Sequence, residues 1–188
     1  MFKSLLRRTL HRPLRDKRGG IMIEFGIAMP LLILLMLGGV ELGRYVLLHQ
    51  KLDRTAMTVA DLVARVNTVD VADLNTIFSA VDLVMTPFTM GSKGVVVISS
   101  VVDQSGVPHV AWQRKGGGTL NLTSDVGNQG GNATLSDSSL VDPTDGIVVG
   151  ETYYDYSPWF ISLLPSARLH HIAIYRPRGA DKVTCSDC

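Results

Sequence analysis

The feature that most constrains this chain is an apolar run of 20 residues near its start. Residues 21–40 read IMIEFGIAMPLLILLMLGGV and contain a single charged side chain, Glu24. At 1.5 Å per residue, a helix of this length spans roughly 30 Å, the thickness of the hydrocarbon core of a bilayer. The run therefore predicts one transmembrane helix, with residues 20–40 as its bounds. Pro30 inside it predicts a kink of the kind that membrane helices tolerate.

The charge of the chain is distributed unevenly on the two sides of this run. Seven of the 18 basic residues but only one of the 17 acidic residues lie in residues 1–19, so this segment carries +6 and the remainder −5. Basic flanking segments stay on the cytoplasmic side of a membrane. We therefore expect residues 1–19 to be a basic cytoplasmic leader and residues 41–188 to be an extracytoplasmic domain. The acidic charge of that domain argues against a nucleic-acid partner.

Other targeting signals match this pattern less well. A cleavable secretory signal has an apolar region of about 7–15 residues followed by a small-x-small cleavage site. Here the run is longer, and residues 37–39 read LGG, which offers leucine at one of those two positions. A twin-arginine signal is disfavoured because several basic residues separate the pair at 7–8 from the run. The Arg-rich residues 1–18 leave a mitochondrial presequence as an alternative.

Glu24 is the informative residue of the run, since a carboxylate at mid-membrane costs about 2.5–3.5 kcal/mol on insertion scales. It either reaches the membrane interface or has a partner. Residues 17–25 around it read KRGGIMIEF. This string resembles the processing site of type IV pilin-like proteins, in which a basic leader ends in glycine and the mature chain carries glutamate at its fifth residue and an aromatic at its sixth. Counted from Gly20, Glu24 is fifth and Phe25 is sixth.

More narrowly, the chain resembles the TadE-like pseudopilins of the tight-adherence (Tad, or Flp) pilus system. In that family a GxxxxEF motif leads into an apolar helix that contains proline, and then into an acid–aromatic amphipathic continuation. Here Pro30 and the ELGRY of residues 41–45 fill those places. The resemblance is weaker in the body, where it covers the YYDY of residues 153–156, the apolar segment 159–165 and the RPR of residues 176–178.

The resemblance implies that a membrane-embedded prepilin peptidase cleaves between Gly19 and Gly20, so that the protein is a substrate and not an enzyme. Cleavage would create a free amine that Glu24, on the same or a neighbouring subunit, could neutralise in the membrane. We hypothesise that Glu24 of this Glu24–Phe25 motif serves packing into a pilus or into its assembly platform.

The resemblance also implies a role and a location. The protein would be a minor pseudopilin in the biogenesis of a Tad pilus, a structure of adhesion, surface attachment and secretion-related functions. Its partners would be the lipid bilayer, the prepilin peptidase, other pilus subunits and the inner-membrane platform proteins. It would cross the bacterial inner membrane once, with its C-terminal domain in the periplasm, and could enter the pilus.

Further helix packing is indicated at the outer end of the run. Gly39 and Gly43 form a GxxxG, a spacing that allows two helices to approach closely, although glycine is also common in membrane helices without such a role. Residues 41–66 contain no proline and repeat apolar side chains at spacings of three or four. This period predicts an amphipathic stalk that continues the membrane helix to about 45 residues in all. Its apolar stripe either packs against the body or binds a partner helix.

The remainder of the chain predicts one more helix followed by strands. Asp70 and Asp73 have the spacing of a helix N-cap and its reciprocal partner, and Pro87 ends the helical pattern. Four strands are expected, at residues 95–102, 107–114, 147–156 and 168–176. The first two form a hairpin, and a Gly/Ser/Asn-rich loop occupies residues 116–145. Helices followed by strands predict an α+β domain with a small antiparallel sheet, which is a pilin-like order.

Candidate chemistry is sparse. Cys185 and Cys188 form a CxxC, and in an oxidising compartment two close thiols predict a small disulfide, with an intermolecular cross-link and metal or redox chemistry as alternatives. Zinc would need two more ligands, for which only His170 and His171 are available, and adjacent strand residues point to opposite faces. We therefore expect no catalytic residue, no cofactor and no metal. Two other functions stay open: a membrane-anchored periplasmic thiol oxidoreductase, and a signal-anchored binding domain whose leader is never cut.

Overall fold

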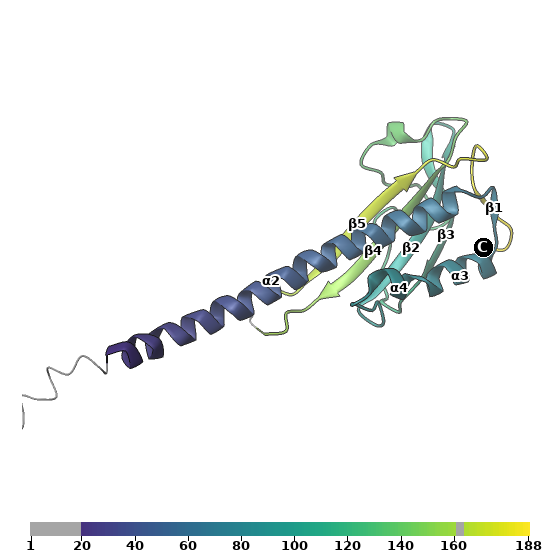
Figure 1. The fold of residues 1–188 in the computed structure, drawn as a ribbon. Coiled ribbons are helices and arrows are strands. Elements are labelled where there is room, and N and C mark those ends of the chain that lie inside the picture. The colour runs from purple at the N-terminus through teal and green to yellow at the C-terminus, as the bar shows by residue number, and fades with distance from the viewer. Residues whose placement is uncertain (1–19, 161–163) are drawn as a thin grey trace, which may run out of the picture.

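One helix forms the stem of the molecule. The computed structural model describes residues 20–160 and 164–188, and helix α2 (Gly20–Ala64) begins the described part. Figure 1 shows its first half extending free of the rest of the protein. Its most apolar 18 residues have a mean hydropathy of 2.3 and none of them is buried, and α2 is the one helix among the described residues that is long and apolar enough to cross a membrane. The predicted membrane helix and stalk are thus one continuous helix.

The body is built around a four-stranded antiparallel sheet. Its strands lie in the order β3 (Val107–Gly116), β2 (Gly94–Gln104), β4 (Ile147–Tyr156) and β5 (Ala167–Tyr175). A two-residue turn joins β2 to β3, and both of its residues have positive φ, 60° at Ser105 and 86° at Gly106. Positive φ at both positions gives the turn the twist that a tight hairpin needs. The predicted α+β class, with long helix, second helix and antiparallel sheet, is confirmed.

The second half of α2 covers one face of this sheet, lying along β4 and β5 (Figure 1). Its buried side chains recur at helical spacing, at Leu48, Leu52, Thr55, Ala56, Val59, Ala60 and Val63. The helix approaches closely at Gly150 of β4, where a Cβ would stand 2.7 Å from the carbonyl oxygen of Ala56 and 2.9 Å from the Cβ of Ala60. The apolar stripe of the stalk therefore packs against the body, which decides between its two interpretations.

The second helix begins where the sequence predicts it, and it is divided. Asp70 and Asp73 form a capping box in which each carboxylate accepts the other residue's backbone N–H. The helix is broken at Ala80 into α3 (Val71–Ser79) and α4 (Val81–Met85). The hydroxyl of Ser79 donates to the carbonyl of Thr76 (2.7 Å), the oxygen that the Ala80 N–H would bind in a continuous helix. The Ala80 N–H instead bonds the carbonyl of Ile77, which tightens the last turn.

The Gly/Ser/Asn-rich segment between β3 and β4 covers the opposite face of the sheet. Val126 and Val141 are buried there in a small cluster with side chains of the strands, and Leu120 and Leu122 pack on a second cluster. Its one described helical turn is η3 (Ser138–Leu140). The sheet therefore lies between helices on one side and this loop on the other.

A short parallel pair of strands, β1 (Thr68–Val69) with β6 (Thr184–Cys185), joins the connection after α2 to the end of the chain. The sequence does not predict this pair. Each strand has only two residues, which is too short for alternation to be recognised.

Candidate functional site

The predicted pilin-like motif lies on the free half of α2. Gly20 is the first residue of the helix, whereas Gly19 lies outside the described residues. Glu24 and Phe25 are exposed, and no hydrogen bond or ion pair to Glu24 is found in the described part of the chain. The structure brings neither of them into contact with the body.

The two glycines of the GxxxG motif are also open. A Cβ built at Gly39 or Gly43 would meet no atom within 4 Å outside its own helix. No packing within the described residues therefore requires a glycine at either position. Whatever these two residues pack against, it is not the body of the same chain.

Glu41 begins the junction between the stem and the body. It lies one residue beyond the predicted membrane run, yet it is only 1% exposed. Its Oε1 accepts a hydrogen bond from the hydroxyl of Tyr156 (2.5 Å), and its Oε2 accepts from the backbone N–H groups of Trp159 (3.0 Å) and Phe160 (3.1 Å). The guanidinium of Arg44 lies 3.3 Å from Oε1. One carboxylate thus fastens the end of β4 and the following segment to the stem.

The electrostatics of this junction favour the ionised carboxylate. The hydrogen bond from Tyr156 holds the pKa of Glu41 below its usual value against the effect of burial, with help from the two backbone amides and the charge of Arg44. Burial and the neighbouring carboxylate raise the pKa of Tyr156 to about 12. The Arg44 guanidinium also lies 3.8 Å from the ring centroid of Trp159, a cation–π contact. We call Glu41, Arg44, Tyr156 and Trp159 the stem latch.

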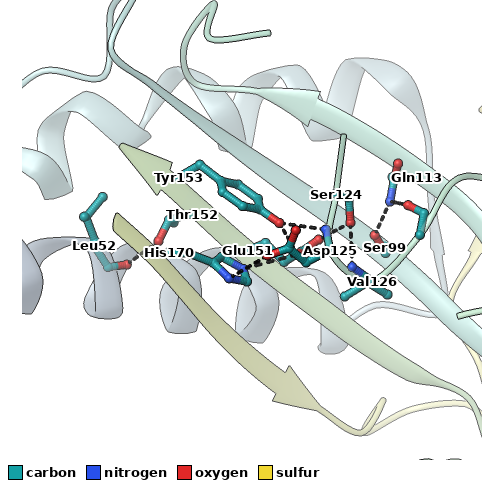
Figure 2. A network of polar contacts seen from close by, with 11 residues as sticks. Leu52, Ser99, Gln113, Ser124, Asp125, Val126, Glu151, Thr152, Tyr153 and His170 are labelled. Atoms are coloured by element: carbon teal, nitrogen blue, oxygen red, sulfur yellow. Dashed lines mark hydrogen bonds and ion pairs between the residues drawn. The ribbon is translucent and has the colours of Figure 1, made fainter. Parts of the chain in front are cut away.

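A second buried carboxylate lies in the middle of the sheet, on the face that the loop covers. Figure 2 shows Glu151 of β4 surrounded by Ser124, Tyr153 and His170. Ser124 donates to Glu151 Oε2, Tyr153 donates to Oε1 (2.6 Å), and His170 Nε2 lies 3.3 Å from Oε1. Asp125 completes the network, because its backbone N–H donates to the Tyr153 hydroxyl (2.8 Å) and its carboxylate lies 3.2 Å from His170 Nδ1.

This network has the residue types of a hydrolase but not their order. In a nucleophilic triad the histidine lies between the hydroxyl and the carboxylate, so that it can take the hydroxyl proton. Here Glu151 lies between Ser124 and His170. Burial would raise the pKa of Glu151, but the hydrogen bonds from its three neighbours outweigh burial and hold that pKa below its usual value, so the carboxylate is a weak base. The arrangement attaches the loop to β4 and β5.

A pair of histidines links the stalk to the edge strand β5. His49 Nδ1 and His171 Nε2 are 2.9 Å apart, so one ring nitrogen donates to the other. Burial lowers the pKa of His171, and the neighbouring imidazoles of His49 and His170 lower it further, while Asp53 at 3.8 Å opposes this shift. His170 points to the other face, toward Glu151, as the alternation of strand residues predicts.

The body is therefore expected to lose stability as the pH falls through the range in which histidine takes up a proton. Because the pKa of His171 is lower in the folded protein than in the unfolded chain, the unfolded chain binds the proton more readily below about pH 6.5. One such proton gives a slope of at most about 1.4 kcal/mol per pH unit. Thermal melts between pH 7.5 and 5 should show this slope, and His171→Gln should reduce it, with His109→Gln on β3 as the control. Equal slopes in all three proteins would contradict the prediction.

The two cysteines lie at the end of the described chain and are joined in a disulfide. Cys185 belongs to β6, and the backbone N–H of the next residue, Ser186, donates to the carbonyl of Val69. A redox-active cysteine of the thioredoxin type lies at a helix N-terminus, which lowers the pKa of its thiol. Cys185 does not have that setting. Within the described ranges, no group of three histidine, cysteine, aspartate or glutamate side chains has a geometry that could hold a metal ion.

The arginines of the RPR sequence hold the body together on two sides. Arg176 pairs with Asp142 of the covering loop (3.0 Å), and Arg178 pairs with Asp61 of α2 (2.8 Å). The backbone N–H of Arg178 also donates to the carbonyl of Ala64 at the end of α2. These residues have a structural role that follows from their neighbours.

The fold thus consists of a membrane-length stem and a body. Buried Glu41 attaches the sheet to the stem, and buried Glu151 attaches the covering loop to the sheet. Residues 19–61 match the family model described as TadE-like protein. The family resemblance found in the sequence is thus confirmed for this segment. The matched segment contains the pilin-like motif, the apolar run and most of the stalk, together with Glu41 and Arg44. No curated protein and no solved structure matches the chain.

Sequence reasoning did not find the burial of either carboxylate. In the sequence, Glu41 belongs to the acid–aromatic continuation and has no recognisable partner, because Tyr156 is 115 residues away along the chain. The sequence offers one indication that Glu151 is buried, because it is the single charged residue among the first eight of the apolar strand at 147–156. Tyr153, a possible hydrogen-bond donor, follows two positions later on the same face of the strand. Its partner Ser124 lies in a loop that has no period, so the sequence offers no means of placing it.

Proposed function

We propose that this protein is a minor pseudopilin of a Tad-type pilus. The free half of α2 anchors it in the inner membrane, and a prepilin peptidase removes the leader between Gly19 and Gly20. The mature chain then packs its stem against the helices of other pilus subunits or of the assembly platform. The TadE-like segment and the membrane-length helix support a membrane-anchored, pilus-associated role. The observation that carries the proposal is the exposed stem, whose motif residues make no contact with the body.

The spacing within the stem supports a role for the motif after cleavage. Gly20 and Glu24 are four residues apart in a helix, so they lie on the same face one turn from each other. An amine at Gly20 would place a positive charge beside the carboxylate, and two such helices could exchange these partners. Pairing of this kind lowers the cost of a carboxylate in the membrane. The proposal assigns the body to the periplasmic side and gives the protein no catalytic role.

The first experiment is mass spectrometry of the N-terminus of the protein purified from its own membrane. The proposal expects a mature chain that begins at Gly20. Glu24→Ala should leave membrane insertion unchanged and should reduce the amount of assembled pilus by about tenfold or more, since the charge pairing would be lost. Met22→Ala is the matched control, because Met22 is also exposed on α2 but occupies a variable position of the motif. An intact leader together with normal pili would overturn the proposal in favour of an uncut, signal-anchored binding domain.

A further inference from the structure

A cavity of about 640 Å³ lies beside the stem latch. One wall is α2 at Arg44 and Leu47, a second is the segment that leads from α4 into β2, and a third includes Trp159. This volume lies within the range of small-ligand sites, about 300–1,000 Å³. Its lining includes Arg44, Phe88, Lys93 and Trp159.

The height of this cavity above the membrane follows from the helix. Arg44 is four residues beyond Val40, the end of the apolar run, which at 1.5 Å per residue is about 6 Å along the axis of α2. The hydrocarbon core is about 30 Å thick and the whole bilayer about 40–45 Å, so each headgroup layer is roughly 5–8 Å deep. If the stem crosses the membrane as proposed above, Arg44 is therefore at the level of the lipid phosphates.

The exposed aromatic residues near Glu41 agree with a position of this part of the body at the membrane interface. Trp159 is 67% exposed and Phe160 is 54% exposed, and the backbone N–H groups of both bind Glu41, which directly follows the apolar run. Tryptophan is enriched where a protein meets the membrane interface. Figure 1 shows the end of β4 as the part of the sheet nearest the free half of α2. The exposed aromatic residues thus lie beside the end of the apolar run, where the membrane interface is expected.

The charges of the cavity suit an anion. Arg44 and Lys93 are its charged lining residues, and none of the residues that line it is acidic. The Arg44 guanidinium is bound by Glu41 through Nη1, whereas its buried Nε has no hydrogen-bond partner among the described residues. Lys93 Nζ donates to the hydroxyl of Ser157 (2.9 Å) and has two further N–H groups. The side chain of Arg44 is 13% exposed, and its remaining guanidinium N–H groups, like those of Lys93, form charge-assisted hydrogen bonds when they meet a phosphate oxygen.

We propose that this cavity binds the phosphodiester headgroup of a phospholipid from the outer leaflet of the inner membrane. Arg44 and Lys93 contact the phosphate oxygens, while Phe88 and Trp159 enclose the glycerol portion of the lipid. The bound lipid fixes the body at one height and one rotation on the membrane, in addition to the anchor supplied by the stem. The proposal rests on the orientation given under the proposed function.

The test uses the full-length protein in a non-ionic detergent and three probes. These are dihexanoyl-phosphatidylglycerol, uncharged dihexanoylglycerol and inorganic phosphate. The chain has two tryptophans, so a Trp112→Phe background leaves Trp159 as the fluorescent reporter in the cavity wall. We expect a saturable change in fluorescence with dihexanoyl-phosphatidylglycerol and none with dihexanoylglycerol. Lys93→Gln and Arg44→Gln should each weaken binding by about tenfold, as expected for loss of a charged hydrogen bond.

Matched controls distinguish loss of this site from a general effect of net charge and from misfolding of a variant. Arg54→Gln removes the same charge from an exposed position of α2, ten residues beyond Arg44, and should leave binding unchanged. Lys93 is exposed, so Lys93→Gln tests the site even if Arg44→Gln disturbs the stem latch. Circular dichroism of each variant verifies its fold.

Each other outcome overturns the proposal in an identifiable way. Equal binding of inorganic phosphate would show a free anion site instead of a lipid site. A fluorescence change that depends on protein concentration and not on lipid would show that a second copy of the chain occupies the cavity. Unchanged binding in both variants would remove Arg44 and Lys93 from the site. Failure of the proposed membrane anchoring would be seen separately, as extraction of the protein from native membranes by carbonate, and failure of the proposed orientation as protection of the body from protease added to the periplasmic side.

Discussion

Replacement of Glu41 by alanine is expected to release the membrane-proximal end of the sheet from the stem. The substitution leaves the Tyr156 hydroxyl, two backbone N–H groups and the Arg44 guanidinium without their shared acceptor. Buried donors without partners are more costly than the loss of an exposed contact. The thermal transition of the body, followed by near-ultraviolet circular dichroism in detergent, should shift down by several degrees. Glu24→Ala removes the same side chain from an exposed position of α2 and should leave this transition unchanged.

The partner of this carboxylate allows a more quantitative version of the same test. Tyr156→Phe retains the ring but removes the hydroxyl that donates to Glu41, and should lower the free energy of unfolding by about 1–3 kcal/mol. For a protein of this size each kcal/mol corresponds to about 2–4 °C in Tm. In a double-mutant cycle, Glu41→Ala and Tyr156→Phe should be clearly non-additive, because they remove one interaction. Additive effects would show that the two residues stabilise the body independently.

The pH dependence of this latch has a definite sign. The pKa of Glu41 is lower in the folded protein than in the unfolded chain, with the Tyr156 hydrogen bond as the main cause. The stabilisation is therefore fully present above the ordinary carboxyl pKa near 4.5 and is lost as the pH falls through the folded value. Glu41→Gln should reduce the loss of stability below that pH, and it should leave the slope above pH 5, which we assign to His171, unchanged.

The second large effect is expected at Gly150, where a side chain would collide with α2. A methyl group there would stand 2.7 Å from the backbone carbonyl oxygen of Ala56, which cannot move without shifting the helix. Gly150→Ala should therefore destabilise the body by about 1–3 kcal/mol, as overpacking of a filled core does, and Gly150→Val by more. Chemical denaturation of the protein in detergent measures this difference directly.

Gly43→Ala provides the matched control on the stem itself. No atom outside its own helix lies within 4 Å of a Cβ at Gly43, and alanine is a better helix residue than glycine by about 0.5–1 kcal/mol. The single-chain stability should thus stay constant or increase slightly. Equal losses at Gly43 and Gly150 would contradict the packing described for α2 and β4.

Local features of this fold could be predicted from the sequence because their causes are local. The apolar run gives the length of the stem, and the repeat of three and four in residues 41–66 gives its continuation as a helix. The Asp70–Asp73 pair gives the start of α3, and the strand at 147–156 is found with the predicted bounds. The sequence does not predict the break at Ala80, because the break depends on the side-chain rotamer that Ser79 adopts in the folded protein.

The same distinction between local and long-range causes applies to the functional residues. Glu24, Phe25, Gly39 and Gly43 could be singled out because their meaning lies in spacing along one helix, and the structure leaves all of them exposed. The cavity beside the stem latch could not be predicted, since its walls come from three segments that are far apart in the chain. Arg44 and Lys93 are ordinary surface cations in the sequence.

Hydrophobicity and period, which act between residues a few positions apart, predict the membrane-length stem, the amphipathic stalk and the α+β body. The TadE-like motif is recognised in the sequence by its resemblance to a known family. Long-range contacts decide that the sheet, and not a partner helix, covers the apolar face of the stalk, and that Glu41 and Glu151 are buried. A buried charge needs several hydrogen-bond donors around it. The chain supplies them from Tyr156, from the backbone after β4 and from Ser124, and folding alone brings these groups together.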